Sequence, residues 1–150
     1  MKIAIGSDHG GYSLKTEIFN YLIKIGYEVT DYGTFDTNSV DYPDYAIKVA
    51  EAIKSGDCEK GIVICGTGLG ISIAANKIPG IRAALCNDSY TAKMSREHND
   101  ANILALGGRV LGAGLAIDIV DVWLKTEFLG GRHQTRVNKI SDIEKMYKKG

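Results

Sequence analysis

The sequence predicts an α/β domain in which helices cover both faces of a parallel sheet. Short apolar, β-branched runs alternate with longer segments whose apolar residues recur every three or four positions, along all 150 residues. Glycines and the pair Pro79-Gly80 separate these segments. Strands that alternate with helices are joined by right-handed crossovers, which place helices on both faces of the sheet. A chain of this length is expected to form one domain, over residues 1–150.

The first half of the chain supplies two strands and two helices. Residues 2–6 form a short apolar run, and the segment 14–25 repeats its apolar residues at helical spacing. Residues 27–32 alternate as a half-buried strand does. After a polar loop, a helix is expected at 45–55, because Gly56 directly follows and glycine commonly ends helices.

The alternation continues through the centre of the chain. The apolar run 61–65 predicts a third, buried strand, and the segment 69–77 predicts a helix. A Pro-Gly break separates this helix from a fourth strand at 82–86. The next helix, at 88–97, is preceded by an Asn-Asp pair, either member of which suits the N-cap position.

The last third of the chain adds one strand and two helices. Residues 103–106 predict the fifth strand, and a glycine turn precedes a long helix at 111–128. A final helix is expected within about 137–149, with its clearest pattern from Ser141 onward. The segment GGRHQTR before it is expected to be a glycine hinge that carries three basic side chains.

The stretch from Gly61 to Asn76, GIVICGTGLGISIAAN, is the strongest candidate for chemistry. It predicts a strand, a tight turn and a helix, and the turn lies at the carboxyl edge, where open α/β sheets bind ligands. Cys65 stands where the strand ends. Glycines in the turn allow a ligand to approach backbone N–H groups, and a helix N-terminus favours anions. We therefore expect a thiol with a lowered pKa beside an anion-binding loop.

Other interpretations of this stretch remain open. Cys65 could be a small buried apolar residue, with glycines that only turn the chain. Known glycine motifs fit poorly, because a dinucleotide fingerprint would place its third glycine at Ile71 and a P-loop would need Gly-Lys-Ser/Thr. Asp88 does follow the next strand, so a nucleotide-binding module remains an alternative of a different class. The misfits favour a small anionic ligand other than a nucleotide.

Asp8 and His9 follow the first strand, and His98 precedes the last. If the strands are parallel, Asp8 and His9 lie at the same edge as Cys65. The alternatives are that Asp8 caps the next helix and that His9 is an ordinary exposed loop residue. An imidazole exchanges protons near neutral pH, which suits His98 to acid–base work. A histidine at a helix C-terminus is equally favoured by the helix dipole.

Arg132 and Arg136 are candidates for binding an anion. They are four residues apart, so on a helical turn they would face one way. Two guanidinium groups on one face suit a phosphate. The alternative is a solvated basic tail, which the residues alone favour.

Composition limits the classes of partner. The chain carries 18 Lys and Arg against 18 Asp and Glu, so it lacks the positive field that nucleic acids or anionic membranes select. Its longest uncharged run, 16 residues, is too short and too rich in glycine to span a bilayer. The N-terminal MKIAIGSDHGG lacks a signal-peptide pattern, so a cytoplasmic protein is expected. Cys58, Cys65 and Cys86 include no C-x-x-C motif, so we expect free thiols rather than a disulfide framework or a zinc cluster.

Five motifs, in order along the chain, resemble those of type B ribose-5-phosphate isomerases. They are SDHGG, CGTGLGISIAANK, CNDSYTA, REHNDANILALGGR and GGRH-x-x-R. The resemblance covers essentially the whole chain, and the combination is highly specific although each motif alone is weak. The subunits of galactose-6-phosphate isomerase and allose-6-phosphate isomerase are close relatives of this family. A six-carbon aldose phosphate is therefore the alternative substrate.

The resemblance implies a three-layer α/β/α sandwich with a five-stranded, parallel, Rossmann-like sheet. It implies an enzyme that interconverts D-ribose 5-phosphate and D-ribulose 5-phosphate through an enediolate, in the non-oxidative branch of the pentose phosphate pathway. No metal or other cofactor is implied. It also implies a homodimer or a dimer of dimers with the active site at the subunit interface, and a C-terminal helix packed on the partner.

The resemblance assigns roles to individual residues. Cys65 would be the base that moves a proton between C2 and C1, and His98 would be the acid/base that opens the furanose ring. Thr67 would either help at the reacting oxygens or only cap the next helix. Contacts to the substrate would come from Asp8, His9, Gly66, Thr67, Gly68, Leu69, Gly70 and Asn99, and contacts to the phosphate from Arg109, Arg132 and Arg136.

A redox or sensing role for Cys65 is a further alternative. Such a role needs a second cysteine that resolves the oxidised sulfur. Cys86 ends the next predicted strand, but the sequence does not place it beside Cys65. We expect no disulfide between them.

Overall fold

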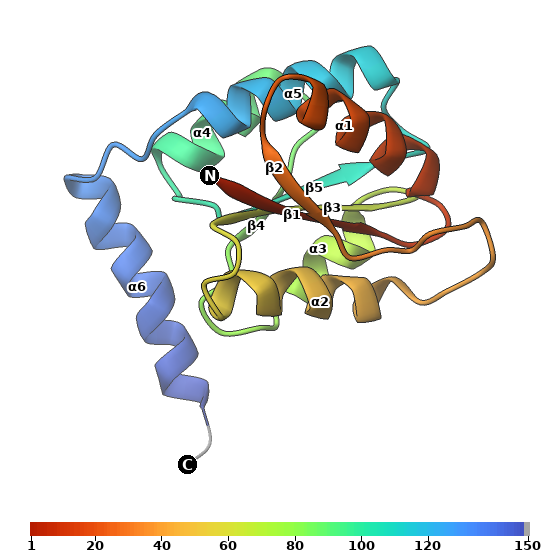
Figure 1. Ribbon diagram of the computed structural model, residues 1–150. Coiled ribbons are helices and arrows are strands. Elements are labelled where there is room, and N and C mark those ends of the chain that lie inside the picture. Colours follow the sequence, from red (N-terminus) through yellow and green to blue (C-terminus); the bar gives the residue numbers. More distant parts are fainter. Residues whose placement is uncertain (149–150) are drawn as a thin grey trace.

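The sheet has five parallel strands in the order β2-β1-β3-β5-β4, which confirms the predicted architecture. The computed structural model describes residues 1–148 (Figure 1). The strands are β1 (Lys2–Ser7), β2 (Glu28–Asp31), β3 (Lys60–Cys65), β4 (Ala83–Leu85) and β5 (Ile103–Gly107). The helices are α1 (Tyr12–Lys24), α2 (Tyr42–Lys54), α3 (Leu69–Ala75), α4 (Ser89–Glu97), α5 (Ala113–Lys125) and α6 (Arg132–Tyr147). Helices α1, α4 and α5 cover one face of the sheet, and α2 and α3 cover the other (Figure 1).

Each central strand contributes to two separate apolar layers, because successive residues point to opposite faces of the sheet. Ile62 and Ile64 of β3 pack beneath α1 and α5, whereas Val63 and Cys65 pack against α2 and α3. Cys86 belongs to the layer under α1 and α5. The three cysteines are free and buried, and the sheet separates Cys65 from Cys86. This arrangement argues against Cys86 as a resolving cysteine.

Helix α6 begins earlier than predicted, whereas the other elements lie within three residues of their predicted bounds. We expected a hinge through GGRHQTR and a helix within about 137–149, but the helix starts at Arg132. Gly130 and Gly131 have φ of 67° and 56°, so two residues complete the turn. Gly131 has no side chain that could cap the helix, so the usual signal for a helix start is missing. Lys149 lies outside the described residues.

Because all five strands are parallel, their carboxyl ends form one edge of the sheet and their amino ends form the opposite edge. Cys65, the last residue of β3, pairs with Gly107, the last residue of β5. Helix α4 runs back across the sheet, so its end, the loop before β5 and the start of α6 lie at the opposite edge (Figure 1). At about 3.3 Å per residue, the four steps from Ile103 to Gly107 separate the two edges by roughly 13 Å. None of the helices within residues 1–148 is long and apolar enough to cross a membrane.

Helix α6 leaves the body of the domain as an arm (Figure 1). Its buried residues are His133 and Val137. The His133 ring stacks on the His98 ring, with centroids 4.1 Å apart and planes at 12°. Burial lowers the pKa of His133, and the nearby His98, Arg132 and Arg136 lower it further, although Glu97 opposes them.

Helix α2 lies close to the sheet because two strand glycines leave room for Val49. A Cβ atom on Gly61 would lie 2.5 Å from Val49 Cγ1, and one on Gly6 would lie 2.9 Å from Val49 Cγ2. Val49 is fully buried. It cannot swing aside, because a helical valine strongly prefers one rotamer. Gly61 therefore sets the spacing between β3 and α2.

We expect Gly61→Ala to destabilise the protein by about 1–3 kcal/mol, the usual cost of overpacking a core. Val49→Ala should also destabilise it, because it leaves a cavity. The double variant should lose less unfolding free energy than the sum of the two single losses, since the shortened side chain at position 49 makes room for the new methyl group. Urea unfolding of the four proteins measures this coupling. Simple additivity would contradict the close contact.

We expect His133 to contribute to a loss of stability as the pH falls below about 6.5, the ordinary pKa of histidine. Its pKa is lowered in the folded chain, so the unfolded chain binds the proton more readily and protonation favours unfolding. The contribution is complete above about pH 6.5 and is lost toward the lowered folded pKa. His133→Phe keeps a stacking ring that cannot be protonated. Its stability should fall less steeply between about pH 7.5 and pH 5 in thermal unfolding; equal slopes would refute this role.

Candidate active site

Three turns meet at the carboxyl edge of the sheet, after β1, β3 and β5. Their backbones are in contact: a Cβ atom on Gly108 would lie 2.7 Å from the Gly10 carbonyl oxygen, and one on Gly10 would lie 3.2 Å from the Gly66 nitrogen. A side chain at Gly108 would clash with this backbone, and one at Gly10 would force the neighbouring turn to shift. The predicted site residues on these turns are Asp8, His9, Cys65, Gly66, Thr67, Gly68, Leu69, Gly70 and Arg109.

Hydrogen bonds fix the turn after β5 to the turn that carries the cysteine. The Gly108 N–H donates to the Cys65 carbonyl oxygen at 2.8 Å, and the Arg109 N–H donates to the Gly66 carbonyl oxygen at 2.9 Å. The Arg109 side chain lies along the same turn, since a Cβ atom on Gly66 would be 3.3 Å from Arg109 Nη1. The guanidinium group of Arg109 is therefore beside the loop that we predicted to bind an anion.

Asp8 is buried, and one of its carboxylate oxygens holds the turn after β1. Asp8 Oδ1 accepts a hydrogen bond from the Gly11 N–H at 3.1 Å, and α1 begins directly after Gly11. Gly11 is the N-cap residue of α1 and no side chain caps this helix, so Asp8 closes the preceding turn instead of capping α1. A carboxylate has two oxygens, so this hydrogen bond is compatible with contact to a ligand.

His9 is held by the loop that connects β2 to α2. The Val40 N–H donates to His9 Nδ1 at 3.2 Å. This bond requires Nδ1 without a proton, so in the neutral ring Nε2 carries the proton and is the nitrogen left to donate to a ligand. His9 is half-buried rather than an ordinary exposed loop residue.

Cys65 lies at the junction of the core and the glycine turn. It is 4% exposed, and its Sγ accepts a hydrogen bond from the Gly68 N–H at 3.2 Å. Gly68 has a φ of 80° and is the residue from which α3 begins. The sulfur is therefore more than an apolar filler, because a backbone donor is aimed at it. The Thr67 hydroxyl accepts a hydrogen bond from the Leu69 N–H at 3.2 Å, but Thr67 precedes Gly68, the N-cap residue of α3, so it closes the turn rather than capping the helix.

The remaining predicted residues form a second group at the opposite edge. His98 ends α4 and stacks on His133, while Arg132 and Arg136 occupy the first two turns of α6. Asn99 lines a groove of about 340 Å³ between the start of β4 and α6. The group thus combines an imidazole pair, an amide and two guanidinium groups.

The two groups do not meet within one chain. Cys65 lies at the carboxyl end of β3, whereas Asn99 precedes the start of β5, which is roughly 13 Å away along the strand direction. A single small ligand cannot touch both groups of the same subunit. Among residues 1–148, no three His, Cys, Asp or Glu side chains gather in a way that could hold a metal ion.

Sequence reasoning missed three residues that shape the site. His133 was counted only among the basic side chains of GGRHQTR, and nothing in the sequence signals its stack on His98. Val40 acts through its backbone, which any residue except proline would supply. Asp100 has a positive φ of 48°, and Asp and Asn are among the few residues that tolerate it.

Comparison with known proteins identifies relatives along nearly the whole chain. A family model described as Ribose/Galactose Isomerase matches residues 3–140. Ribose-5-phosphate isomerase B of Escherichia coli (strain K12) is 54% identical over 143 residues, 95% of this chain and 96% of that protein. D-erythrulose-4-phosphate isomerase of Pectobacterium atrosepticum is 46% identical over 145 residues, 96% of this chain and 95% of that protein.

A solved structure confirms the fold. Ribose-5-Phosphate Isomerase B of Clostridium thermocellum is 72% identical and superposes with a TM-score of 0.98, covering 99% of this chain and 100% of that one. The similarity predicted from five short motifs is therefore present in sequence and in three dimensions. The chain belongs to the ribose/galactose isomerase family.

Proposed function

We propose that the protein interconverts D-ribose 5-phosphate and D-ribulose 5-phosphate. The observation that carries this proposal is the sulfur of Cys65, which accepts an N–H from a glycine turn at the ligand-binding edge of the sheet. A base beside backbone donors suits the removal of a proton next to a carbonyl group. The relative from E. coli, named ribose-5-phosphate isomerase B, supports this substrate.

In the proposed reaction, Cys65 acts as a thiolate. It removes the proton from C2 of the open-chain aldose, the C2–H electron pair forms a C1–C2 double bond, and the oxygen on C1 takes up negative charge. Return of the proton from sulfur to C1, with transfer of the O2 proton to O1, completes the ketose. The amides of residues 66–70 would stabilise the enediolate oxygens, where the loss of one donor typically costs about 10²–10³ in rate. Thr67 would assist there or only hold the turn before α3.

The second group would open the ring and hold the phosphate. His98 would take the proton from the anomeric hydroxyl while the ring oxygen gains one, and Asn99 would contact the sugar. Arg132 and Arg136, with Arg109, would bind the phosphate, and Asp8 and His9 would contact the sugar beside Cys65. Holding the distant phosphate orients the reacting carbon.

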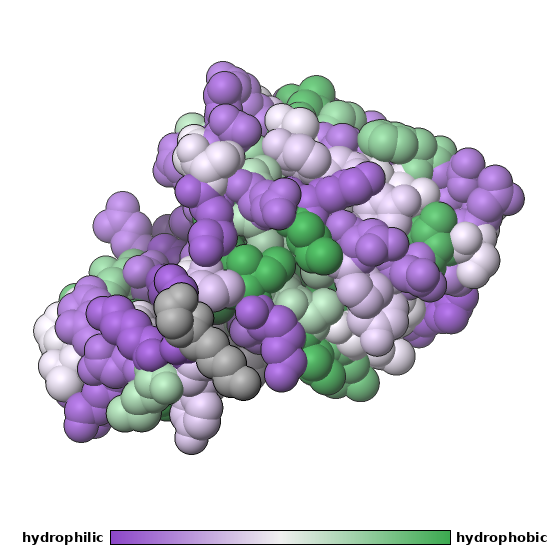
Figure 2. Space-filling view, turned by 90° about the horizontal axis from the view of Figure 1, so that it is seen from below, coloured by the Kyte–Doolittle hydropathy of each residue, from purple (hydrophilic) through white to green (hydrophobic). Residues whose placement is uncertain are grey.

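The proposed site is completed by a second copy of the chain. Its two groups lie at opposite edges of one subunit, so a homodimer, or a dimer of dimers, would bring Cys65 of one subunit to His98 of another. Apolar side chains that such an interface would cover are exposed, in α3 Leu69 and Ile73 (55% and 60%) and in α6 Met146 (75%). Figure 2 shows this side of the molecule, with apolar surface beside α6 and over the α2–α3 layer. We propose that α6 packs on the partner.

Three further expectations belong to this proposal. The enzyme would work without a metal or other cofactor, and in the cytoplasm. Its substrate would be a five-carbon aldose phosphate. The six-carbon aldose phosphates, allose 6-phosphate or galactose 6-phosphate, are the alternative. One relative, D-erythrulose-4-phosphate isomerase, is named for a four-carbon substrate.

We expect the purified protein to isomerise ribose 5-phosphate faster than allose 6-phosphate, with a chelator present. Cys65→Ala should lower kcat by about 10²–10⁴-fold, the usual contribution of a positioned base. Cys58→Ala is the matched control, since it removes a buried thiol outside the proposed site. A coupled assay on the three proteins measures both effects. Full activity of Cys65→Ala would eliminate the proposed base.

We expect two inactive variants to restore activity to each other. In a mixed dimer of Cys65→Ala and His98→Asn, one site contains both defects and the other contains neither. Random mixing with refolding should therefore recover about a quarter of the wild-type turnover of ribose 5-phosphate, given a symmetric dimer. Each variant refolded alone is the control. No recovery, in mixtures shown to contain mixed dimers, would mean that each subunit carries a complete site.

A further inference from the structure

Asp100 occupies an unusual backbone position directly after the proposed ring-opening residues. Its φ of 48° makes it the one non-glycine residue with positive φ among residues 1–148. Aspartate tolerates this conformation better than most residues, but it persists only where the surroundings hold it. The chain therefore turns sharply after Asn99.

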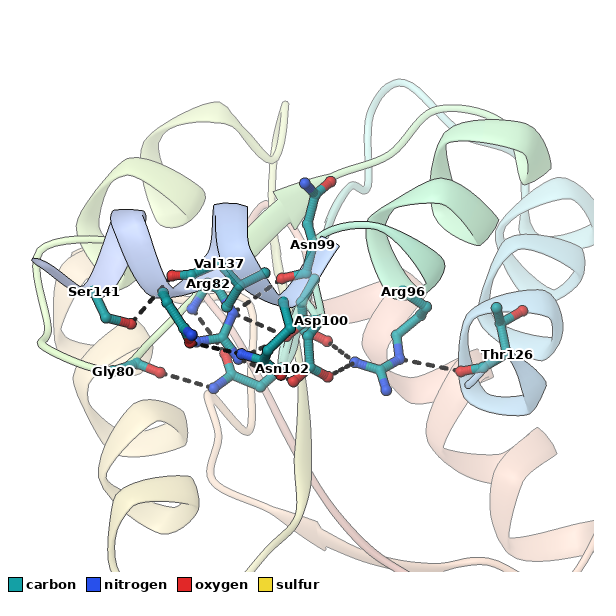
Figure 3. Close-up of polar contacts among 12 residues, drawn as sticks. Gly80, Arg82, Arg96, Asn99, Asp100, Asn102, Thr126, Val137 and Ser141 are labelled. Carbon is teal, nitrogen blue, oxygen red and sulfur yellow. Dashed lines mark hydrogen bonds and ion pairs between the residues drawn. The ribbon is translucent and has the colours of Figure 1, made fainter. Parts of the chain in front are cut away.

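Two arginines hold Asp100 in this conformation (Figure 3). Arg82 Nε donates to the carbonyl oxygens of Asn99 and Asp100, both at 3.0 Å, and its Nη2 reaches the Asp100 carbonyl at 2.9 Å. Arg96 Nη1 donates to Asp100 Oδ1 at 3.0 Å and to the Ala101 carbonyl at 2.6 Å. Arg82 Nη2 also lies 3.4 Å from Asp100 Oδ2. We call Arg82, Arg96 and Asp100 the Asp100 clamp.

The Asp100 clamp is anchored to the buried core of the domain. Arg96 is 7% exposed, its Nε donates to the Thr126 carbonyl at 3.2 Å, and its guanidinium lies 5.9 Å from the centre of the Trp123 ring. Thr126 follows α5 and begins the segment that leads to α6. The same arginine therefore supports the loop after α4 and the segment before the phosphate-binding helix.

The contacts of the clamp leave the functional side chains free. Arg82 binds the backbone oxygen of Asn99, and the Asn99 side chain points away from the clamp (Figure 3). His98 stacks on His133 instead of entering the network. Backbone and side chain thus have separate tasks in this loop.

We propose that Asp100 is a positioning residue that fixes His98 and Asn99 for opening of the sugar ring. This inference rests on the function proposed above. Asp100 touches no reacting atom in this role. It acts by holding the turn that presents its two neighbours to the substrate.

Rates measured with two substrates distinguish a positioning role of Asp100 from a mere loss of folded enzyme. Ribose 5-phosphate is a furanose in water and must be opened. Ribulose 5-phosphate cannot form that ring, because the hydroxyl that would close it carries the phosphate. A displaced His98 should lower kcat for ribose 5-phosphate and leave kcat for ribulose 5-phosphate nearly unchanged. A loss of folded enzyme would lower both values equally.

The experiment compares kcat for both substrates in Asp100→Asn and Asp100→Gly. Asparagine tolerates positive φ and keeps one acceptor oxygen, so Asp100→Asn should stay within about threefold of wild type on both. Asp100→Gly permits the same backbone and keeps the carbonyl oxygen that Arg82 binds, but it removes both carboxylate oxygens. It should lower kcat for ribose 5-phosphate by about 10- to 10²-fold, the scale expected when a catalytic group is misplaced by about 1 Å. It should change kcat for ribulose 5-phosphate by less than about threefold.

Three comparison variants complete the test. His98→Asn shows how large the split between substrates is when the ring-opening group itself is lost. Lys93→Met removes an exposed ion pair to Glu97 on the same helix and should change neither rate. Arg82→Lys weakens the clamp while residue 100 stays aspartate. It should therefore lower kcat for ribose 5-phosphate more than kcat for ribulose 5-phosphate, by a smaller factor than Asp100→Gly, and it serves as the test if Asp100→Gly fails to fold.

The outcomes are distinct. Equal slowing of both substrates in Asp100→Gly, or no split in Arg82→Lys, would overturn the positioning role. A wild-type protein that converts neither substrate would overturn the proposed function itself.

Discussion

The turns that follow β1, β3 and β5 touch one another through their backbones, and the arrangement of the carboxyl edge depends on that contact. A methyl group on Gly11 would lie 2.5 Å from the Ile64 carbonyl oxygen, and one on Gly108 would lie 2.7 Å from the Gly10 carbonyl oxygen. Side chains at these positions would force the turns apart. Cys65, whose sulfur accepts the Gly68 N–H, would then lose its fixed relation to Asp8 and His9.

The direction of the strands gives each edge its own chemistry. The edge with Cys65 carries a sulfur and backbone donors, which suits a reaction at carbon. The other edge carries His98, Arg132 and Arg136, which suits proton exchange on oxygen and the binding of a phosphate. The residues of the second edge lie at the end of α4, in the loop before β5 and at the start of α6, instead of directly after a strand. The Asp100 clamp and the stack of His98 on His133 fix their positions.

The fold and half of the site follow from rules that act locally along the chain. Strand and helix periodicity predicted all eleven elements. Of the two residues predicted as the cap of α4, Asn87 and Asp88, it is Asp88 that forms the cap, with Oδ1 accepting the Thr91 N–H at 2.7 Å. The position of Cys65 followed from the end of an apolar strand. The predicted start of α6 was wrong, because two glycines stand where a capping side chain would normally signal the start of a helix. The Asp100 clamp could not be predicted, because Arg82 contacts residues 17 and 18 positions away.

In the proposed dimer, the separation of the two groups would also make assembly and ligand binding interdependent. A sugar phosphate that touches both groups must bridge two chains, so part of its binding energy acts between subunits. By thermodynamic reciprocity, whatever factor the ligand adds to subunit affinity, association adds to ligand affinity. Occupied enzyme should therefore resist dissociation on dilution better than empty enzyme, so the metabolite itself would help to keep the quaternary structure together.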